Sequence, residues 1–471
     1  MSDDPASPSH GTSTPLPSLS SAERRAYARN LPKYYLFVFL SEAQLWFPIW
    51  IAFLLLDRGL SLTEIAIIDA PFWLLVVLAE VPTGAVADRW GRAISLSLGA
   101  TVYAISLIAF AFAPTLPWIM ATYMVWAVAL TLTSGADSAL VYDTLKVLGR
   151  EREYERFAGR GMAVRSVALV IAVFAGGPLV AATTFQTPMF IGAGFLVAAA
   201  LVAMTFKEPP RLEIGSQLSY IHGVRAAFRT VWRHPQLRTL IPFAAVIMAG
   251  TMATEYLTQP FLLSHDVDVG FAFSGLQVPI RITGVIGALI AFTVVARMGE
   301  VRTLLALPVI GVVGYVGLAL WDALGAIVLL ALLGFVRSFA FPVVTGYINR
   351  RIPSDQRATV LSLNQVAFSL ILAPMVPALG ISADKIDLPT GFAVAAGILA
   401  VLALITGIAW ARTHRHPSGP TPSLAQVVPP PHPALGVVAR AKAQRAGASP
   451  RPQPALGGSA SILPQDAAAG D

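Results

Sequence analysis

The chain has 471 residues, of which 55% are hydrophobic and only 13% are charged. A soluble domain usually carries about 25% charged residues, so this chain cannot cover its apolar side chains with a water-facing surface. Composition therefore excludes an ordinary soluble protein, and the absence of cysteine excludes disulfides and thiolate metal sites.

Apolar runs long enough to cross a bilayer recur along the whole chain. A hydrocarbon core about 30 Å thick needs about 20 mainly apolar residues in a helix. Barrel strands would be shorter and would alternate in polarity. The sequence therefore predicts an all-α membrane protein with twelve transmembrane helices, at 34–56, 62–84, 93–113, 117–145, 161–183, 187–206, 238–263, 271–296, 303–321, 324–347, 358–380 and 390–412.

These spans fall into two sets of six, which we expect to form a first half at 34–206 and a second half at 238–412. Between them lies a central cytoplasmic loop, 207–237, and the apolar residues of its second half recur at helical spacing. That pattern predicts an amphipathic helix on the membrane surface. The polar N-terminus, 1–33, and the tail rich in Pro, Ala and Gly, 413–471, are predicted to be disordered and cytoplasmic.

The basic residues gather on one side of this layout. With the N-terminus inside, only Arg58 and Lys385 fall in outer loops, and Arg165, Arg281 and Arg337 fall within helices. All other Lys and Arg lie in inner segments, as expected for cytoplasmic loops. We therefore expect a multi-pass protein of the plasma (inner) membrane with both termini cytoplasmic. This topology accounts for the net charge of +7 without a nucleic-acid partner.

One motif follows the second span. It runs Gly, three residues, Asp-Arg, one residue, Gly and then a basic residue, at Gly84, Asp88, Arg89, Gly91 and Arg92. In sequence and position it resembles the signature of the major facilitator superfamily between helices 2 and 3. The resemblance covers roughly residues 30–412. It implies two pseudo-symmetric halves of six helices around a central cavity, the MFS fold.

The resemblance also implies that this loop is a conformational latch between the halves. Gly84 is expected to let a neighbouring helix approach closely. Asp88 can cap a helix N-terminus or pair with an arginine. Gly91 permits the turn, and Arg89 and Arg92 hold the loop at the anionic inner leaflet. Simple anchoring of the loop on the cytoplasmic side is the alternative.

Ionisable residues within the spans are the candidate functional residues, because in lipid they need a cavity or a partner. We expect proton coupling or a substrate cavity to involve Glu42, Asp69, Glu255, Arg281 and Arg337. Asp137 and Arg165, near the inner ends of helices 4 and 5, form a candidate buried ion pair. A purely structural role is the alternative for each of these residues.

These features predict a secondary active transporter of a small organic solute, working by alternating access and coupled to protons in the efflux direction. The efflux direction is inferred from a weaker resemblance to drug-efflux members of the family, at Gly176-Gly177-Pro178 and at 134–143. Uptake or exchange of a metabolite or organic anion is the alternative, because Arg281 and Arg337 lie in the second half. A membrane sensor or enzyme without transport is a third interpretation.

The sequence shows no nucleotide-phosphate loop and no cluster of catalytic or metal-binding residues. We therefore expect no enzymatic activity, no cofactor and no metal. The expected partners are the small-molecule substrate, protons and the lipid bilayer, and the protein is expected to be a monomer.

Overall fold

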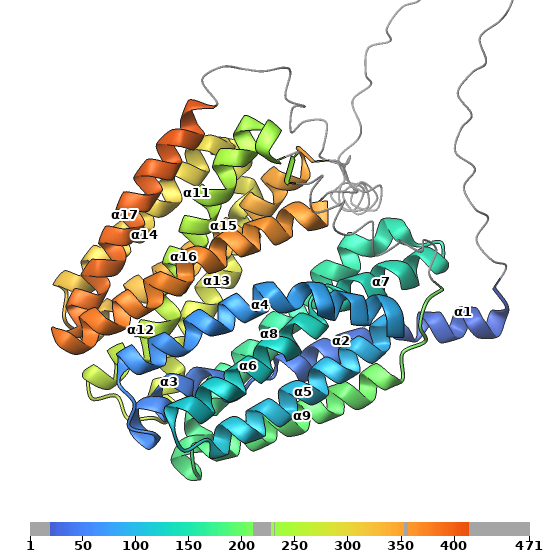
Figure 1. Cartoon of the computed structure of the whole chain (residues 1–471), viewed down its shortest axis with the longest axis horizontal. Helices are drawn as coiled ribbons and strands as arrows, with labels where there is room; N and C mark the ends of the chain where they lie inside the picture. Colours follow the sequence, from blue (N-terminus) through green and yellow to red (C-terminus); the bar gives the residue numbers. More distant parts are fainter. Residues whose placement is uncertain (1–18, 211–227, 230, 353–356, 414–471) are drawn as a thin grey trace, which may run out of the picture. The chain divides into compact units, whose positions relative to one another are not determined.

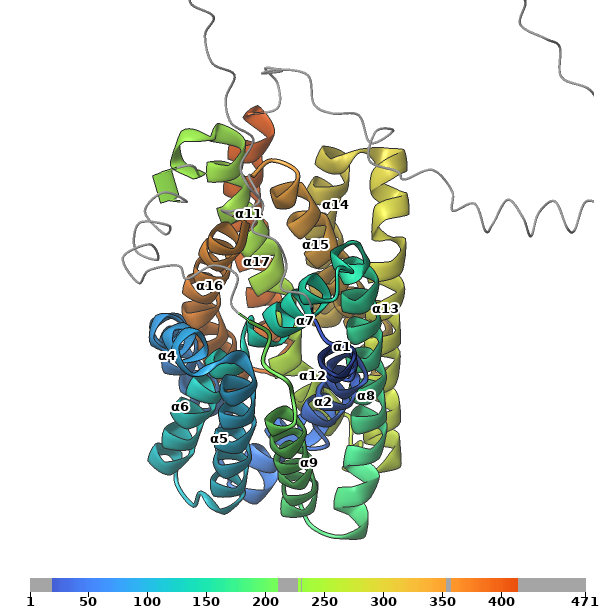
Figure 2. The same ribbon diagram turned by 90° about the vertical axis from the view of Figure 1, so that its right-hand side faces the viewer.

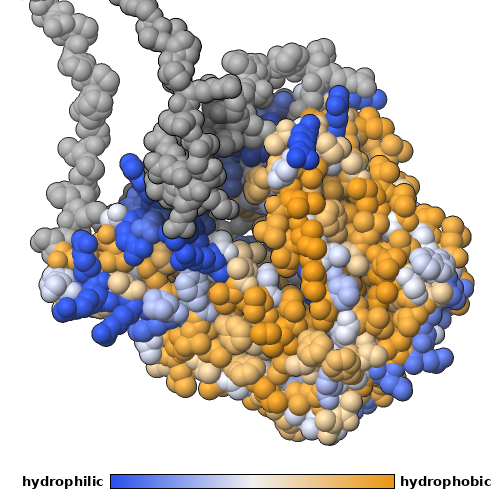
Figure 3. All heavy atoms as spheres, turned by 180° about the vertical axis from the view of Figure 1, so that it is seen from behind, coloured by the Kyte–Doolittle hydropathy of each residue, from blue (hydrophilic) through white to orange (hydrophobic). Residues whose placement is uncertain are grey.

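The computed structural model describes residues 19–210, 228–229, 231–352 and 357–413, and all of these belong to one compact unit. Within the described residues, twelve helices or runs of helices are long and apolar enough to cross a membrane. Broad apolar surface covers the face in Figure 3, and hydrophilic residues gather toward its margins. The predicted all-α class with twelve transmembrane helices is confirmed.

The helices are labelled as in Figure 1. Those of the first half are α1 (Ser21–Ala28), α2 (Asn30–Glu42), α3 (Trp50–Ala52), α4 (Leu62–Trp90), α5 (Arg92–Phe112), α6 (Leu116–Thr133), α7 (Ala136–Val147), α8 (Tyr154–Ala182) and α9 (Gln186–Met204). Those of the second half are α11 (Pro235–Met252), α12 (Thr254–Ser264), α13 (Phe271–Met298), α14 (Glu300–Leu320), α15 (Ile327–Asn349), α16 (Arg357–Lys385) and α17 (Leu388–Arg412).

The two halves meet along two pairs of long helices. α4 packs against α16, and α8 packs against α13. In Figure 2 the first pair lies on one side of the unit and the second pair on the other, with α2 and α7 between them. The halves are therefore in contact through α4 and α16 on one side and through α8 and α13 on the other.

Several spans that the sequence predicts as continuous are interrupted. Here helix 1 to helix 12 denote the twelve membrane spans in chain order, as distinct from the labels α1 to α17. Helix 4 breaks between α6 and α7 at Gly135, whose φ of 72° is a left-handed conformation that glycine adopts without strain. Helix 1 is irregular between α2 and α3, where Pro48 lies in a short 3₁₀ turn, Phe47–Ile49, and it ends in a π-helical turn, Phe53–Asp57. Helix 7 is interrupted at Ala253, between α11 and α12.

The prediction of disorder over 1–33 is wrong for residues 21–33, which are helical. α1 starts with a capping box. The backbone N–H of Glu23 donates to the Ser20 hydroxyl oxygen, and the backbone N–H of Ser20 donates to the Glu23 carboxylate. Tyr27 and Leu31 are buried against the first half, which explains why this segment folds. Residues 1–18, most of the predicted amphipathic helix (211–227 and 230) and the tail from 414 lie outside the described residues.

Candidate functional site

A cavity of about 700 Å³ lies between the halves. Its lining comes mainly from α2, α4, α6, α7 and α8 of the first half, and the second half contributes Phe341, Leu361 and Gln365. The lining residues lie toward one end of the helices, the end at which the motif at 84–92 is found. We call this end the motif end. The opposite end, with the α3–α4, α12–α13 and α16–α17 connections, is called the far end.

Three charged side chains form a cluster in the cavity wall, the first-half cluster. Arg165 Nη1 lies 3.0 Å from Glu42 Oε1, and Arg165 Nη2 lies 3.5 Å from Asp137 Oδ2. The Arg165 side chain is 40% exposed, so it faces the cavity. The structure thus brings Asp137 and Arg165 together, but not as a buried pair. Two ionised carboxylates around one guanidinium leave a net charge of about −1.

A second cluster, the second-half cluster, has the opposite balance. Glu255 accepts hydrogen bonds from Arg281 Nη1 and Nη2, at 2.7 and 2.6 Å, and from Arg337 Nη1 at 2.5 Å. The Glu255 and Arg281 side chains are only 11% and 12% exposed. None of the three is among the residues that line the 700 Å³ cavity. However, Phe341, one turn along α15 from Arg337, does line it.

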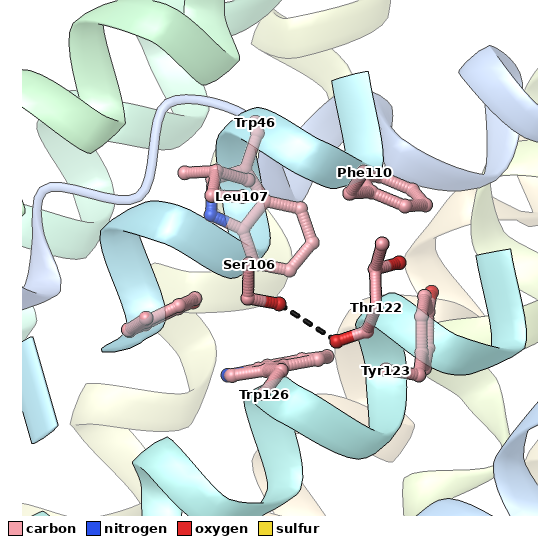
Figure 4. Close-up of a pocket in the computed structure, with 8 residues that line it drawn as sticks. Trp46, Ser106, Leu107, Phe110, Thr122, Tyr123 and Trp126 are labelled. Atoms are coloured by element: carbon pink, nitrogen blue, oxygen red, sulfur yellow. Dashed lines mark hydrogen bonds between the residues drawn. The ribbon is translucent and has the colours of Figure 1, made fainter. Parts of the chain in front are cut away.

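Asp69 does not line the cavity either, because it is 3% exposed and packed inside the first half. Its neighbour Phe72 belongs to an aromatic cluster, and the Phe72 and Trp126 ring centroids are 4.8 Å apart. Figure 4 shows part of this cluster around a small pocket, where the Ser106 hydroxyl donates to the Thr122 carbonyl oxygen at 2.7 Å.

Several buried polar atoms of this region have no hydrogen-bond partner among the described residues. They are Asp69 Oδ2, Trp46 Nε1, Trp73 Nε1, Tyr103 Oη and Tyr123 Oη. Tyr103 and Trp73 also line the large cavity, so this aromatic region adjoins it. A buried carboxyl oxygen without a hydrogen-bond partner favours the protonated form of the group or a nearby water.

At the motif end, Gly91 makes the predicted turn, with φ of 105°. The carboxylate that caps the following helix, α5, comes from Glu208 and accepts from the backbone N–H of Arg92 at 2.8 Å and of Ala93 at 3.0 Å. The Arg92 side chain forms an ion pair with Asp143 of α7. This loop therefore bonds to α7 of its own half and to the segment that follows α9.

Two expectations for the motif are wrong in this conformation. Asp88 is exposed and has no hydrogen bond or ion pair among the described residues, because Glu208 occupies the helix cap. Gly84 has open space where a Cβ would be, so no helix of the described part of the chain approaches it closely. Arg89 is exposed, as a residue at a membrane surface would be.

The far end is closed by contacts between the halves. Asp384 of α16 accepts from the backbone N–H of Leu62 at 3.1 Å and of Thr63 at 2.5 Å, and so caps α4. The backbone N–H of Gly177 donates to Ser274 Oγ at 2.8 Å. These bonds bring the halves together at the far end, while the cavity lies toward the motif end.

Sequence reasoning found most of the charged residues but not all of their partners. The contact predicted between Asp137 and Arg165 is present, and Glu255 and Arg281, predicted as separate candidates, also form an ion pair. Neither Glu42 beside Arg165 nor Arg337 beside Glu255 was expected, because depth does not indicate which helices are neighbours. Glu208 was missed because it follows helix 6, far along the chain from the cap it provides.

The comparisons with known proteins agree with this architecture. The sequence model of the family described as the Major Facilitator Superfamily matches residues 34–374 of this chain. An uncharacterised MFS-type transporter, YxaM of Bacillus subtilis (strain 168), is 25% identical over 337 residues, which are 67% of this chain and 79% of YxaM.

Similar solved structures show the same fold. A mutant of the nucleoside transporter NupG has a TM-score of 0.70 at 16% identity, over 81% of this chain and 99% of that one. A bacterial homologue of the human lysosomal transporter Spinster, in an inward-facing and unoccupied conformation, has a TM-score of 0.66 at 15% identity, over 85% and 100%. This chain is a multi-pass membrane transporter that belongs to the Major Facilitator Superfamily.

Proposed function

We propose that this protein is a proton-coupled transporter that exports a small organic solute by alternating access. The observation that carries this proposal is the cavity with a charged cluster in its wall. A volume of about 700 Å³ lies within the range of about 300–1,000 Å³ typical of small-molecule sites. Basic residues gather at the motif end, so we propose that this end is cytoplasmic and that the conformation is inward-open.

The first-half cluster is the proposed proton site. Arg165 neutralises one of its two carboxylates, and a proton on Glu42 would neutralise the other. A solute that displaces this proton would be exchanged against it, and the proton gradient would drive export. Asp69 is the second candidate, because it is buried and its Oδ2 has no hydrogen-bond partner among the described residues.

The test uses purified protein in liposomes that contain a pH-sensitive dye. Ethidium, uridine and benzoate are added outside, one at a time, without a pH gradient. In proton exchange, entry of a transported solute drives protons out, so the interior becomes alkaline. We expect Glu42→Gln to abolish this response and Asp69→Asn to reduce it. Glu151→Gln, at an exposed position outside the cavity, is the control.

The proton proposal fails if Glu42→Gln and Asp69→Asn both keep the full wild-type response, and Glu255 is then the next candidate. A wild-type protein that transports a solute without any pH change would be a facilitator, or would use another ion. Uridine is in the panel because a similar structure is a nucleoside transporter.

Uptake or exchange of a metabolite or organic anion is the second candidate function. The surplus positive charge of the second-half cluster favours it. The same assay separates the two mechanisms, because import of an anion together with a proton would make the interior acidic. We further propose a location in the plasma (inner) membrane, both termini cytoplasmic and a monomeric state.

A further inference from the structure

We infer that the transported solute carries an anionic group of the carboxylate class, which binds Arg337 of the second-half cluster. This rests on the proposed function only in taking the cavity as the path of the solute.

The second-half cluster has more donors and more positive charge than Glu255 can satisfy. Glu255 Oε1 is shared by Arg281 and Arg337, and only Arg281 is held through both carboxylate oxygens. Arg281 Nε is buried without a partner among the described residues. The other hydrogen bond of Arg337 among the described residues is to Met252 Sδ at 3.2 Å, and a thioether is a weak acceptor. A second carboxylate would supply the missing charge and acceptors.

The geometry gives such a group one route of access. The Phe47 ring centroid lies 5.1 Å from the Arg281 guanidinium and covers it. The Arg337 side chain is 30% exposed, and Phe341 on the next turn of α15 lines the cavity. An anion in the cavity would therefore reach Arg337 first and leave Glu255 with Arg281, with which it already forms two bonds.

The two clusters have opposite net charges and would therefore bind ligands of opposite charge. The first-half cluster has a charge of about −1 and would be neutralised by a proton, whereas the second-half cluster has about +1 and would be neutralised by an anion. In an exchange cycle the proton and the anion would bind in alternate steps, and each would neutralise its own cluster within the bilayer.

The test compares 2-naphthoate with 2-naphthamide, which has nearly the same shape but no charge. Affinities for purified full-length protein are measured at neutral pH without a gradient. We expect the carboxylate to bind about tenfold more tightly than the amide, the effect of one charge-assisted hydrogen bond. Arg337→Gln should remove this preference, and Glu255→Gln should increase it because an internal competitor is gone.

Arg302→Gln, which removes an exposed guanidinium outside the cluster, is the matched control and should keep the wild-type preference. The inference is overturned if the carboxylate binds no better than the amide, or if Arg337→Gln keeps the preference. Because no proton gradient is used, this result is independent of the coupling assay. A failure of proton coupling would leave a measured carboxylate preference intact.

Helix 1 has a gap in its hydrogen bonding that two glutamines of the second half fill. In a continuous α-helix the N–H groups of Ile51 and Ala52 would bond to the carbonyl oxygens four residues before, those of Phe47 and Pro48. Instead, both N–H groups donate to Gln259 Oε1 at 3.0 Å. Gln259 Nε2 donates to the Phe47 oxygen at 3.2 Å, and Gln277 Nε2 donates to the Pro48 oxygen at 3.0 Å.

We propose that these amides hold the far end closed, and that helix 1 forms the two missing bonds itself when the far end opens. Gln259 and Gln277 are each 3% exposed, so the bonds are shielded from water. Leaving buried N–H and carbonyl groups unpaired would oppose opening. Rewinding gives each backbone group a new partner, so the two conformations stay close in free energy.

The test combines two measurements on Gln259→Leu/Gln277→Leu. Spin labels at cysteines placed at Thr115 and Asp322, on exposed connections of opposite halves at the far end, report the distance between the halves. We expect a population with a longer distance than in the wild type. Hydrogen exchange of the segment 50–53 reports rewinding, and its amides should stay protected in the variant.

Gln186→Leu is the control, because its amide is also at the far end but bonds to Asp57 rather than to the gap in helix 1. The proposal is overturned if the double variant keeps the wild-type distances. It is equally overturned if the far end opens and the amides of 51 and 52 exchange rapidly, since helix 1 would then not have rewound.

Discussion

The contact between Gly380 and α4 allows a quantitative test of alternation between two conformations. Gly380 lies in α16 at the far end, where this helix crosses α4 of the other half. A Cβ at this position would lie 2.6 Å from the Leu62 carbonyl oxygen and 2.8 Å from the Ala66 Cβ. Both atoms are fixed by the backbone of a helix, so neither can rotate away. Gly380→Ala must therefore push the halves apart at the far end.

The expected size of this effect follows from the cost of overpacking, which is about 1–3 kcal/mol for an added methyl group in a tight contact. That cost falls only on the conformation with a closed far end. Since about 1.4 kcal/mol corresponds to a tenfold change in an equilibrium constant, the ratio of open to closed far end should rise about 5- to 150-fold.

The assay measures the distance between spin labels at positions 115 and 322, in a chain that has no native cysteine. Gly397→Ala is the matched control, because this helical glycine of α17 has nothing within 4 Å of the added methyl group. The variant Gly380→Ala should populate longer distances, and Gly397→Ala should not. Identical distributions in the two variants would refute the reasoning.

Three further predictions concern the motif end and the topology. Glu208→Gln should lower the free energy of unfolding by about 1 kcal/mol, the usual value of a helix N-cap. Arg89→Gln, at an exposed position of the motif, should change it little, and thermal unfolding measures both. Asp88→Asn should leave the melting temperature unchanged and impair transport, because Asp88 has no described partner in this conformation; normal transport would reduce the motif to an anchor. A cysteine at position 268 should react with an impermeant reagent in intact cells and one at 229 should not, and strong labelling at 229 would contradict the topology.

The twelve spans could be predicted because the bilayer leaves few choices to the backbone. Every N–H and carbonyl in lipid needs an internal partner, so an apolar run of about 20 residues must be a helix. The breaks at Pro48 and Gly135 escaped prediction, although proline and glycine mark both positions. Whether such a residue interrupts a helix depends on what accepts the freed backbone groups, and for helix 1 the acceptor lies in the other half of the chain.

Charge and depth along a helix are properties of the sequence, and they identified Glu42, Arg165, Glu255 and Arg281 as residues that need a cavity or a partner. The sequence also determined the membrane class, the number of helices and the motif that indicates the family. Only the tertiary structure decided that Arg337 joins Glu255 and that Asp69 is closed off from the cavity. These outcomes depend on which helices are neighbours and how they are rotated, and packing between segments far apart in the chain sets both.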